Sequence, residues 1–122
     1  MVPANSIPIR LDKIQIAANP DQLAWQPFRP GVDIYPLYQA PETQHRVALL
    51  RYQPGAEIPR HAHPGFEQIL VLSGSQADDH GHCRAGTLTI NPPGSHHQVA
   101  SPEGCIVLIC WEKPVVMPPD GA

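Results

Sequence analysis

The sequence predicts an all-β fold, a sandwich or barrel of short strands in one domain. Short apolar runs alternate with turn residues along most of the chain, at the spacing typical of such folds. Sixteen prolines and nine glycines make long helices unexpected, because proline removes a backbone donor and clashes with the preceding helical turn. A length of 122 residues suits a single domain with one core.

The expected strands follow one another from about Trp25 onward. They are Val32–Tyr38, His45–Tyr52, Glu57–His63, Glu67–Ser73, Thr87–Ile90, His97–Ala100 and Cys105–Trp111. The turns between them are Pro54-Gly55, Pro64-Gly65, Ser73-Gly74, Asp79-His80-Gly81, Pro93-Gly94 and Glu103-Gly104. Glycine tolerates positive φ and proline presets the first corner of a turn, so each of these pairs marks the end of a strand.

The two ends of the chain are expected to lie outside the barrel. We expect residues 1–20 to form an N-terminal arm or an extra strand, since Leu11, Ile14 and Ile16 are apolar. Residues 21–117 form the predicted barrel domain, and residues 118–122 a C-terminal tail that frays.

Two strands are apolar at successive positions instead of alternate ones, namely Ile69–Leu72 and Cys105–Trp111. Both faces of such strands should be covered. We therefore predict a homodimer, while the N-terminal arm is a second candidate for the same cover.

Composition excludes several classes of function. The formal charge is −3 and the basic residues are scattered, so a nucleic-acid partner is not expected. The start of the chain does not resemble a secretory signal, and no stretch has the roughly 20 apolar residues of a membrane span, which predicts a cytoplasmic protein without membrane contact. Three cysteines without a CxxC pair predict free thiols, with Cys105 and Cys110 on opposite faces of one strand.

The stretch RHAHPGFE carries the chemistry. On a strand, residues two apart share a face, so His61 and His63 project together. Pro64-Gly65 then turns the chain and Glu67 opens the next strand toward the same point. Imidazole and carboxylate suit a divalent ion, with zinc or iron as the first candidates and manganese or nickel as further ones.

A further ligand is expected from the segment NPPGSHHQ. His96 and His97 are adjacent on an expected strand, so only one of them faces inward. Placing His97 and Val99 inside leaves Gln98 and Ala100 outside, which is the tidier division. We therefore predict His61, His63, Glu67 and His97 as metal ligands.

Two motifs in the chain resemble those of the cupins. Gly55 to Gly74 matches the first cupin motif, which is glycine, five residues, HxH, three residues, glutamate, six residues and glycine. Gly86 to Ser101 is similar to the second motif, and it also selects His97, although Ser101 replaces a frequent asparagine. The resemblance implies a jelly-roll β-barrel of the RmlC-like kind, with a small-molecule ligand inside.

Within the cupins, the chain looks most like the ChrR-like group, named after the C-terminal domain of an anti-sigma factor. The matching residues are Trp25, Pro27-Phe28, Pro30-Gly31-Val32, LLRYQPGAEIPRHAHPG, NPPGS, SPEGC and Lys113-Pro114-Val115. The resemblance implies zinc or iron bound by His61, His63, Glu67 and His97. Only about twenty residues precede the cupin, so we do not expect the two-domain regulator itself.

The metal decides between two functions. With iron, we expect a dioxygenase-type enzyme that cleaves a small aryl ketone or diketone-like substrate, with Glu67 as a possible catalytic base. With zinc, which has no redox chemistry, we expect a non-catalytic sensor or regulatory module. A metal-free carbohydrate-binding or epimerase-type cupin ranks last.

The remaining histidines have ordinary interpretations. His80 and His82, beside Asp78, Asp79 and Cys83, fit a solvated hairpin turn better than a second metal site. His45 and His96 are expected on the surface. Arg60 should point away from the metal because it is next to His61.

Overall fold

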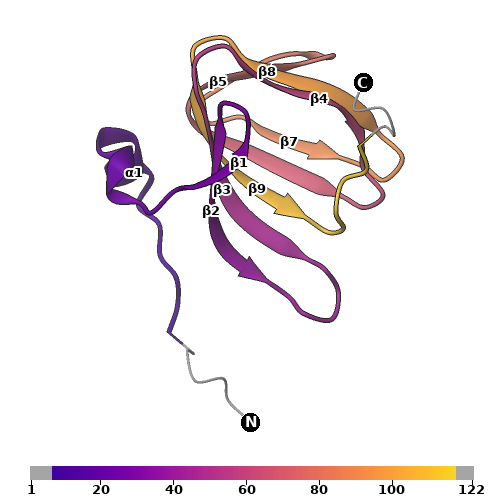
Figure 1. Cartoon of the computed structure of the whole chain (residues 1–122), viewed down its shortest axis with the longest axis horizontal. Coiled ribbons are helices and arrows are strands. Elements are labelled where there is room, and N and C mark those ends of the chain that lie inside the picture. Colours follow the sequence, from indigo (N-terminus) through magenta and orange to yellow (C-terminus); the bar gives the residue numbers. More distant parts are fainter. Residues whose placement is uncertain (1–6, 118–122) are drawn as a thin grey trace.

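The computed structural model describes residues 7–117 and confirms the all-β prediction (Figure 1). Nine strands are present in this range. They are β1 Gln26–Arg29, β2 Val32–Gln39, β3 Arg46–Tyr52, β4 Ala56–Ala62, β5 Glu67–Asp78, β6 Gly81–Arg84, β7 Leu88–Asn91, β8 His96–Ser101 and β9 Cys105–Trp111. The helical elements are α1 Lys13–Ala18 and the 3₁₀ turn η1 Pro20–Gln22.

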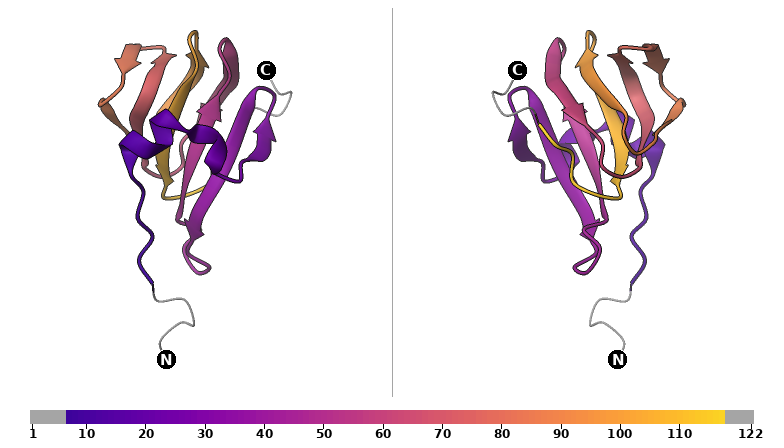
Figure 2. Two further views of the ribbon diagram at one scale, coloured as in Figure 1. Left: turned by 90° about the vertical axis from the view of Figure 1, so that its left-hand side faces the viewer. Right: turned by 90° about the vertical axis from the view of Figure 1, so that its right-hand side faces the viewer.

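The strands form one curled antiparallel sheet with the neighbour order β1-β2-β3-β9-β5-β8-β4. Strands β6 and β7 pair with β5 outside this path. β5 is twelve residues long, and it pairs with β9 and β7 in its first half and with β6 and β8 in its second. It thereby joins two layers that face each other in Figure 2, which gives the jelly-roll barrel that the motifs implied.

Alternation along the strands builds the core between the layers. β3 and β9 pair without a bulge over their whole length, so Leu50 and Val107 face inward side by side and are almost fully buried. Where β5 passes from one layer to the other, Gly74 has a φ of +73° and a Cβ there would lie 2.0 Å from the Gly104 carbonyl oxygen. Only glycine fits this crossing of the chain.

The N-terminal segment forms a short helix, whereas the sequence predicted either an arm or an extra strand there. Asp12 caps α1, since its Oδ1 accepts a hydrogen bond of 2.9 Å from the Ile14 amide. Ile16 is 3% exposed and packs on Leu49 and Ile106, on the outer face of the sheet. The helix thus covers part of the outer face of the strands that are apolar on both faces. The sequence predicted such cover by the N-terminal segment as the alternative to a partner subunit.

The sequence missed two strands and the full length of a third. β1 contains Pro27, which reads as a strand breaker, yet it pairs with β2 at the edge of the sheet. β6 is short and polar, and the second half of β5 buries Ser75 and Gln76, so neither gives an apolar run. The predicted tail at residues 118–122 lies outside the described residues.

Within residues 7–117 no helix is long and apolar enough to span a bilayer.

Candidate metal centre

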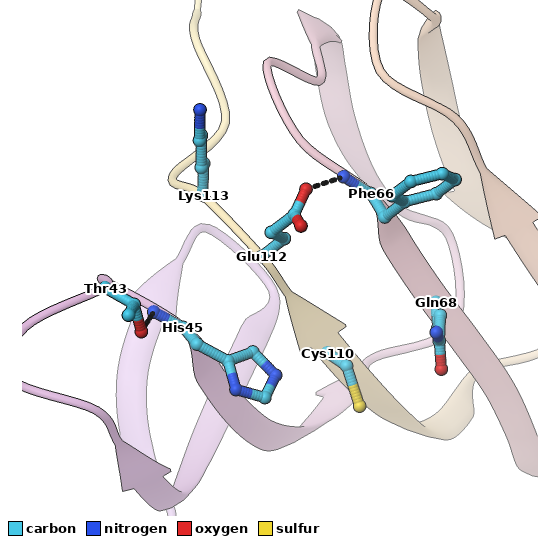
Figure 3. Close-up of a pocket in the computed structure, with 7 residues that line it drawn as sticks. All are labelled: Thr43, His45, Phe66, Gln68, Cys110, Glu112 and Lys113. Atoms are coloured by element: carbon cyan, nitrogen blue, oxygen red, sulfur yellow. Dashed lines mark hydrogen bonds between the residues drawn. The ribbon is translucent and has the colours of Figure 1, made fainter.

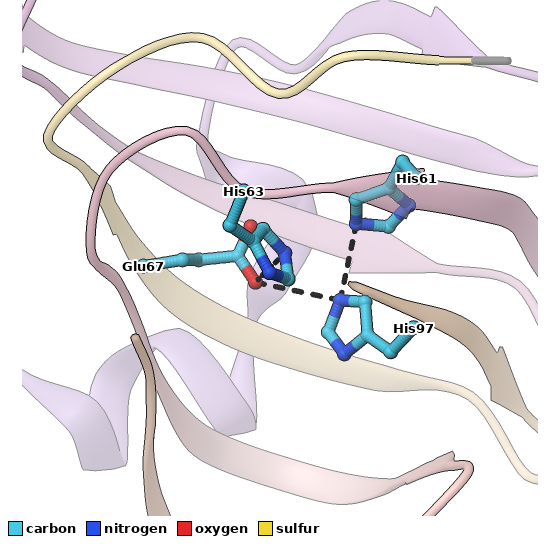
Figure 4. Close-up of side chains that lie close together, drawn as sticks. All are labelled: His61, His63, Glu67 and His97. Carbon is cyan, nitrogen blue, oxygen red and sulfur yellow. Dashed lines mark hydrogen bonds and ion pairs between the residues drawn. The ribbon is translucent and has the colours of Figure 1, made fainter. Parts of the chain in front are cut away.

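The structure brings the four predicted ligand residues together inside the barrel (Figure 4). The residues are His61, His63, Glu67 and His97, and each is between 2% and 5% exposed. One potential ligand atom from each residue lies within 4.8 Å of all the others. This buried cluster of three imidazoles and one carboxylate could hold a metal ion.

Strand register explains why these residues meet. His61 on β4 pairs directly with His97 on β8, so their side chains emerge on the same inner face. His63 follows two residues after His61, and Glu67 begins β5 just beyond the turn at Pro64-Gly65. His96 points outward, as predicted, and is exposed next to Arg60, whose Nη1 lies 2.9 Å from its Nδ1.

Hydrogen bonds on the far side of two rings fix their orientation. Nδ1 of His61 lies 2.8 Å from the Pro59 carbonyl oxygen, which only accepts, so this nitrogen donates. Nδ1 of His63 lies 2.9 Å from Ser95 Oγ, while the Ser95 hydroxyl donates to the Pro92 carbonyl at 2.6 Å. Both rings therefore present an Nε2 lone pair to the centre of the cluster, the form in which histidine binds metals.

The carboxylate of Glu67 is held by two buried donors from neighbouring strands. Trp111 Nε1 donates to Oε2 at 3.0 Å, and Asn91 Nδ2 donates to Oε1 at 3.2 Å. Oε1 also lies 3.1 Å from His63 Nε2 and 3.5 Å from His97 Nε2. The carboxylate therefore has one oriented position, facing the imidazoles.

The donor set fits a divalent cation. With its Nδ1 donating to Ser95, neutral His63 has an acceptor at Nε2, and this buried atom has no hydrogen-bond partner although a carboxylate oxygen faces it. The Nε2 atoms of His61 and His97 are 3.0 Å apart. A single metal ion between these atoms would satisfy all four groups at once.

The electrostatics of the cluster favour the metal-binding protonation states. Burial lowers the pKa of His61, although the Pro59 carbonyl and the Glu67 charge oppose this, and burial likewise lowers the pKa of His97 against the charge of Glu67. Burial acts to raise the pKa of Glu67, but its contacts with the surrounding imidazoles bring it below its ordinary value. These directions favour neutral imidazoles at His61 and His97 and an ionised carboxylate at Glu67.

Sequence reasoning missed the residues that support the cluster. Ser95, Asn91 and Trp111 were not singled out. Asp78 was assigned to a solvated hairpin turn, yet its Oδ2 lies 3.6 Å from Nδ1 of His97. Ser95 lies two residues before His97 in the sequence, so its place near the cluster could have been predicted from this spacing. Trp111 gives no local signal, since its role depends on β9 lying beside β5.

A small apolar cavity of about 30 Å³ adjoins the cluster. Its walls include His61, Glu67 and His97, together with Tyr52 and Val99. Burial strongly raises the pKa of Tyr52, so its hydroxyl stays protonated beside the cluster.

A larger hollow of about 560 Å³ lies on the outside of the barrel, away from the cluster (Figure 3). It is lined by Thr43, His45, Phe66, Gln68, Cys110, Glu112 and Lys113.

The three cysteines are free, as predicted, and burial raises the pKa of the Cys110 thiol in the wall of this outer hollow. Within residues 7–117, the one cluster of potential metal ligands lies inside the barrel, so we place the candidate site there and not in the outer hollow.

The curled antiparallel barrel, with these side chains gathered inside it, defines a cupin. A family model described as the ChrR Cupin-like domain matches residues 13–115. The chain belongs to this ChrR cupin-like family. No curated protein matches it.

Several solved structures share the fold. A Ralstonia eutropha JMP134 protein of unknown function with a cupin-like fold is 26% identical, with a TM-score of 0.68, covering 75% of this chain and 62% of that one. An acetylacetone dioxygenase from Acinetobacter johnsonii is 18% identical, with a TM-score of 0.74, covering 100% of this chain and 88% of that one. A chain from the Rhodobacter sphaeroides complex of SigE with the anti-sigma ChrR is 22% identical, with a TM-score of 0.66, covering 88% and 70%. The present chain thus spans less than two thirds of the Ralstonia protein.

Proposed function

We propose that the protein is a metal-dependent dioxygenase-type enzyme that acts on a small aryl ketone or diketone-like substrate. One observation carries the proposal. The ligand cluster borders a cavity with apolar walls, so a bound ion would have a side free of protein ligands. The similarity in fold to the Acinetobacter acetylacetone dioxygenase supports the same class of reaction.

The residues of the chain have distinct roles in this proposal. His61, His63, Glu67 and His97 would hold iron, or else manganese or nickel, and such an ion supplies the activation of oxygen. Ser95 and the Pro59 carbonyl keep two of the imidazoles in the ligand tautomer. Glu67 is the candidate catalytic base, since its carboxylate is ionised, oriented by Trp111 and directed into the cavity.

Metal analysis followed by oxygen uptake tests this function. Untagged protein, purified without chelators, is expected to contain iron, manganese or nickel near one per chain. It should then consume oxygen with acetylacetone or with acetophenone-type ketones. Metal-free His97→Ala protein is the matched control. Zinc near one per chain, with no oxygen uptake across the substrate panel after reloading with iron, would overturn the enzyme proposal.

That second outcome would favour a zinc-binding sensor or regulatory module. This alternative is supported by membership of the ChrR cupin-like family, together with a ligand set that can close a tetrahedral site. The next step would then be a search for a protein partner by co-purification instead of a search for a substrate.

We also propose that two copies of the chain associate. Residues 7–12 are extended and run away from the barrel in Figures 1 and 2, with Ile7 82% and Ile9 61% exposed. Alternate apolar residues on an extended segment are typical of a strand that packs on a sheet. On the outer face of the sheet, Leu88 and Ile90 are similarly exposed. A second copy of the chain would cover both patches at once.

Sedimentation of the wild type should give twice the chain mass. A double variant, Ile7→Asp with Ile9→Asp, should sediment as a monomer, because charge is costly in an apolar contact. Arg10→Asp, a charge change on the same segment outside the apolar positions, is the control. A monomeric wild type would overturn this association.

A further inference from the structure

A further hollow lies beside the inner cavity that borders the metal-ligand cluster. This vestibule has a volume of about 220 Å³ and is lined by Phe28, Arg29, Gln39, Gln44, Arg46, Trp111, Pro114 and Val115. Four of these residues, Phe28, Arg29, Trp111 and Val115, also line the inner cavity beside the cluster. The vestibule and the inner cavity are therefore adjacent, because these four residues line both.

Strand pairing places one arginine in line with the cluster. Arg46 on β3 pairs with Trp111 on β9, and Trp111 pairs with Glu67 on β5. The guanidinium of Arg46 lies 5.4 Å from the centroid of a Trp111 ring, whose indole nitrogen donates to Glu67. Two strand spacings, about 10 Å, separate the backbones of Arg46 and Glu67. A small molecule would thus reach from the guanidinium to the cluster.

The two vestibule arginines differ from the other partly buried arginines in having no carboxylate partner. Arg51 is paired with Asp21 and Asp33, and Arg60 with Asp79. Within residues 7–117, neither Arg29 nor Arg46 has an ion pair. Each stacks on an aromatic ring instead, and Arg29 lies 5.3 Å from the Phe28 centroid. Two unpaired guanidinium groups face one small hollow.

The rest of the vestibule fits a ligand that carries an anionic group. Gln44, at its rim, has a φ of +66°, a conformation that residues other than glycine seldom adopt and that often marks functional positions. Among the described lining residues of the vestibule and the inner cavity, Glu67 is the one acidic side chain. The remaining walls combine apolar and aromatic side chains with the neutral amides of Gln39 and Gln44. A positive, partly apolar hollow in a chain of net charge −3 would attract small anions.

We propose that Arg29 and Arg46 bind the carboxylate of a small aryl keto acid at the mouth of the barrel. The carbonyl group of this ligand lies at the opposite end of the molecule and points to the metal-ligand cluster. A planar guanidinium binds a carboxylate through two parallel hydrogen bonds, while Phe28 and Trp111 contact the ring of the ligand. The orientation of the carbonyl rests on the proposed function, but the carboxylate site does not.

Calorimetry with a matched pair of ligands tests the carboxylate site. The probes are 4-acetylbenzoate and its uncharged analogue 4-acetylbenzamide, titrated into the protein as purified, without turnover. We expect the acid to bind at least tenfold more tightly than the amide. Arg29→Met and Arg46→Met should each remove most of this difference by weakening acid binding more than amide binding, and Arg46→Lys should keep part of it.

Arg60→Met is the matched control, since Arg60 lies outside the vestibule and is partnered by Asp79. It should preserve the preference for the acid. Equal binding of acid and amide by the wild type, or an unchanged preference in both arginine variants, would overturn the proposal. A clear acid preference without oxygen uptake for any metal would support the carboxylate site while contradicting the enzymatic function, so the two proposals fail separately.

Discussion

Two stretches of the chain carry the pattern histidine, any residue, histidine, and they have opposite environments. His61 and His63 are buried at the inner face of the barrel, whereas His80 and His82 are exposed at the hairpin between β5 and β6. The first pair has Nδ1 partners at Pro59 and Ser95, and Nε2 of His63 faces the carboxylate of Glu67. The comparison teaches that the spacing of histidines makes a candidate site only where the sheet buries and orients them.

Removing the metal should produce the largest difference between the two regions. An ion present at a thousand times its dissociation constant stabilises the fold by about 4 kcal/mol. Chelator treatment should therefore lower the melting temperature by several degrees in scanning calorimetry. A variant with both His80→Ala and His82→Ala should respond to chelator as the wild type does. An unchanged melting temperature in the wild type would contradict a filled site in the barrel.

Loss of one ligand should have the next largest effect. Glu67→Ala removes the carboxylate of the cluster and leaves buried imidazoles without a negative partner. We expect the metal affinity to fall more than 100-fold, beyond the roughly 10- to 100-fold typical of losing a supporting contact. Elemental analysis after dialysis would measure this. Retention of a full complement of metal would show that the ion is bound by other residues.

A smaller effect is expected from the residue that orients His63. Ser95→Ala removes the hydroxyl that accepts from His63 Nδ1 and donates to the Pro92 carbonyl. The ring then loses its fixed orientation, and the metal affinity should fall about 10-fold. Competition with a chromogenic chelator gives the affinity. Ser73→Ala, on the same strand as Glu67 but outside the cluster, serves as the control.

The smallest effect is expected in the hairpin. His80→Ala and His82→Ala change exposed side chains, so stability should stay within about 0.5 kcal/mol of the wild type. Metal content should remain the same. Loss of metal in either variant would show that the hairpin histidines contribute to the metal site.

The sequence predicted those parts of the site that depend on local geometry. Two-residue periodicity places His61 and His63 on one face, and the choice of His97 over His96 follows from the same rule. Asn91 and Trp111 could not be predicted in this way, because their contact with Glu67 requires β7 and β9 to flank β5. The order of strands in a sheet depends on contacts between segments distant in the sequence, and local apolar patterns do not predict it.

The same limit applies to the fold. β9 was predicted with its observed bounds, since every residue in it is apolar and it is bounded by turn residues. α1 was not predicted, because a helix of six residues shows a single buried position, Ile16. Its stability comes from packing on the sheet and from its cap, and local propensity contributes little at this length.

The last described segment of the chain has a consequence for how the barrel opens. Val116 pairs with Ala62, the residue between the first two histidines of the cluster, through two backbone hydrogen bonds of 2.9 Å. Val115 and Met117 on either side line the inner cavity. Fraying of this segment would therefore loosen the strand end that carries the imidazoles. Opening of the barrel at this segment and release of the ion are therefore coupled. Tighter ion binding should slow the exchange of the Ala62 and Val116 amide hydrogens with solvent.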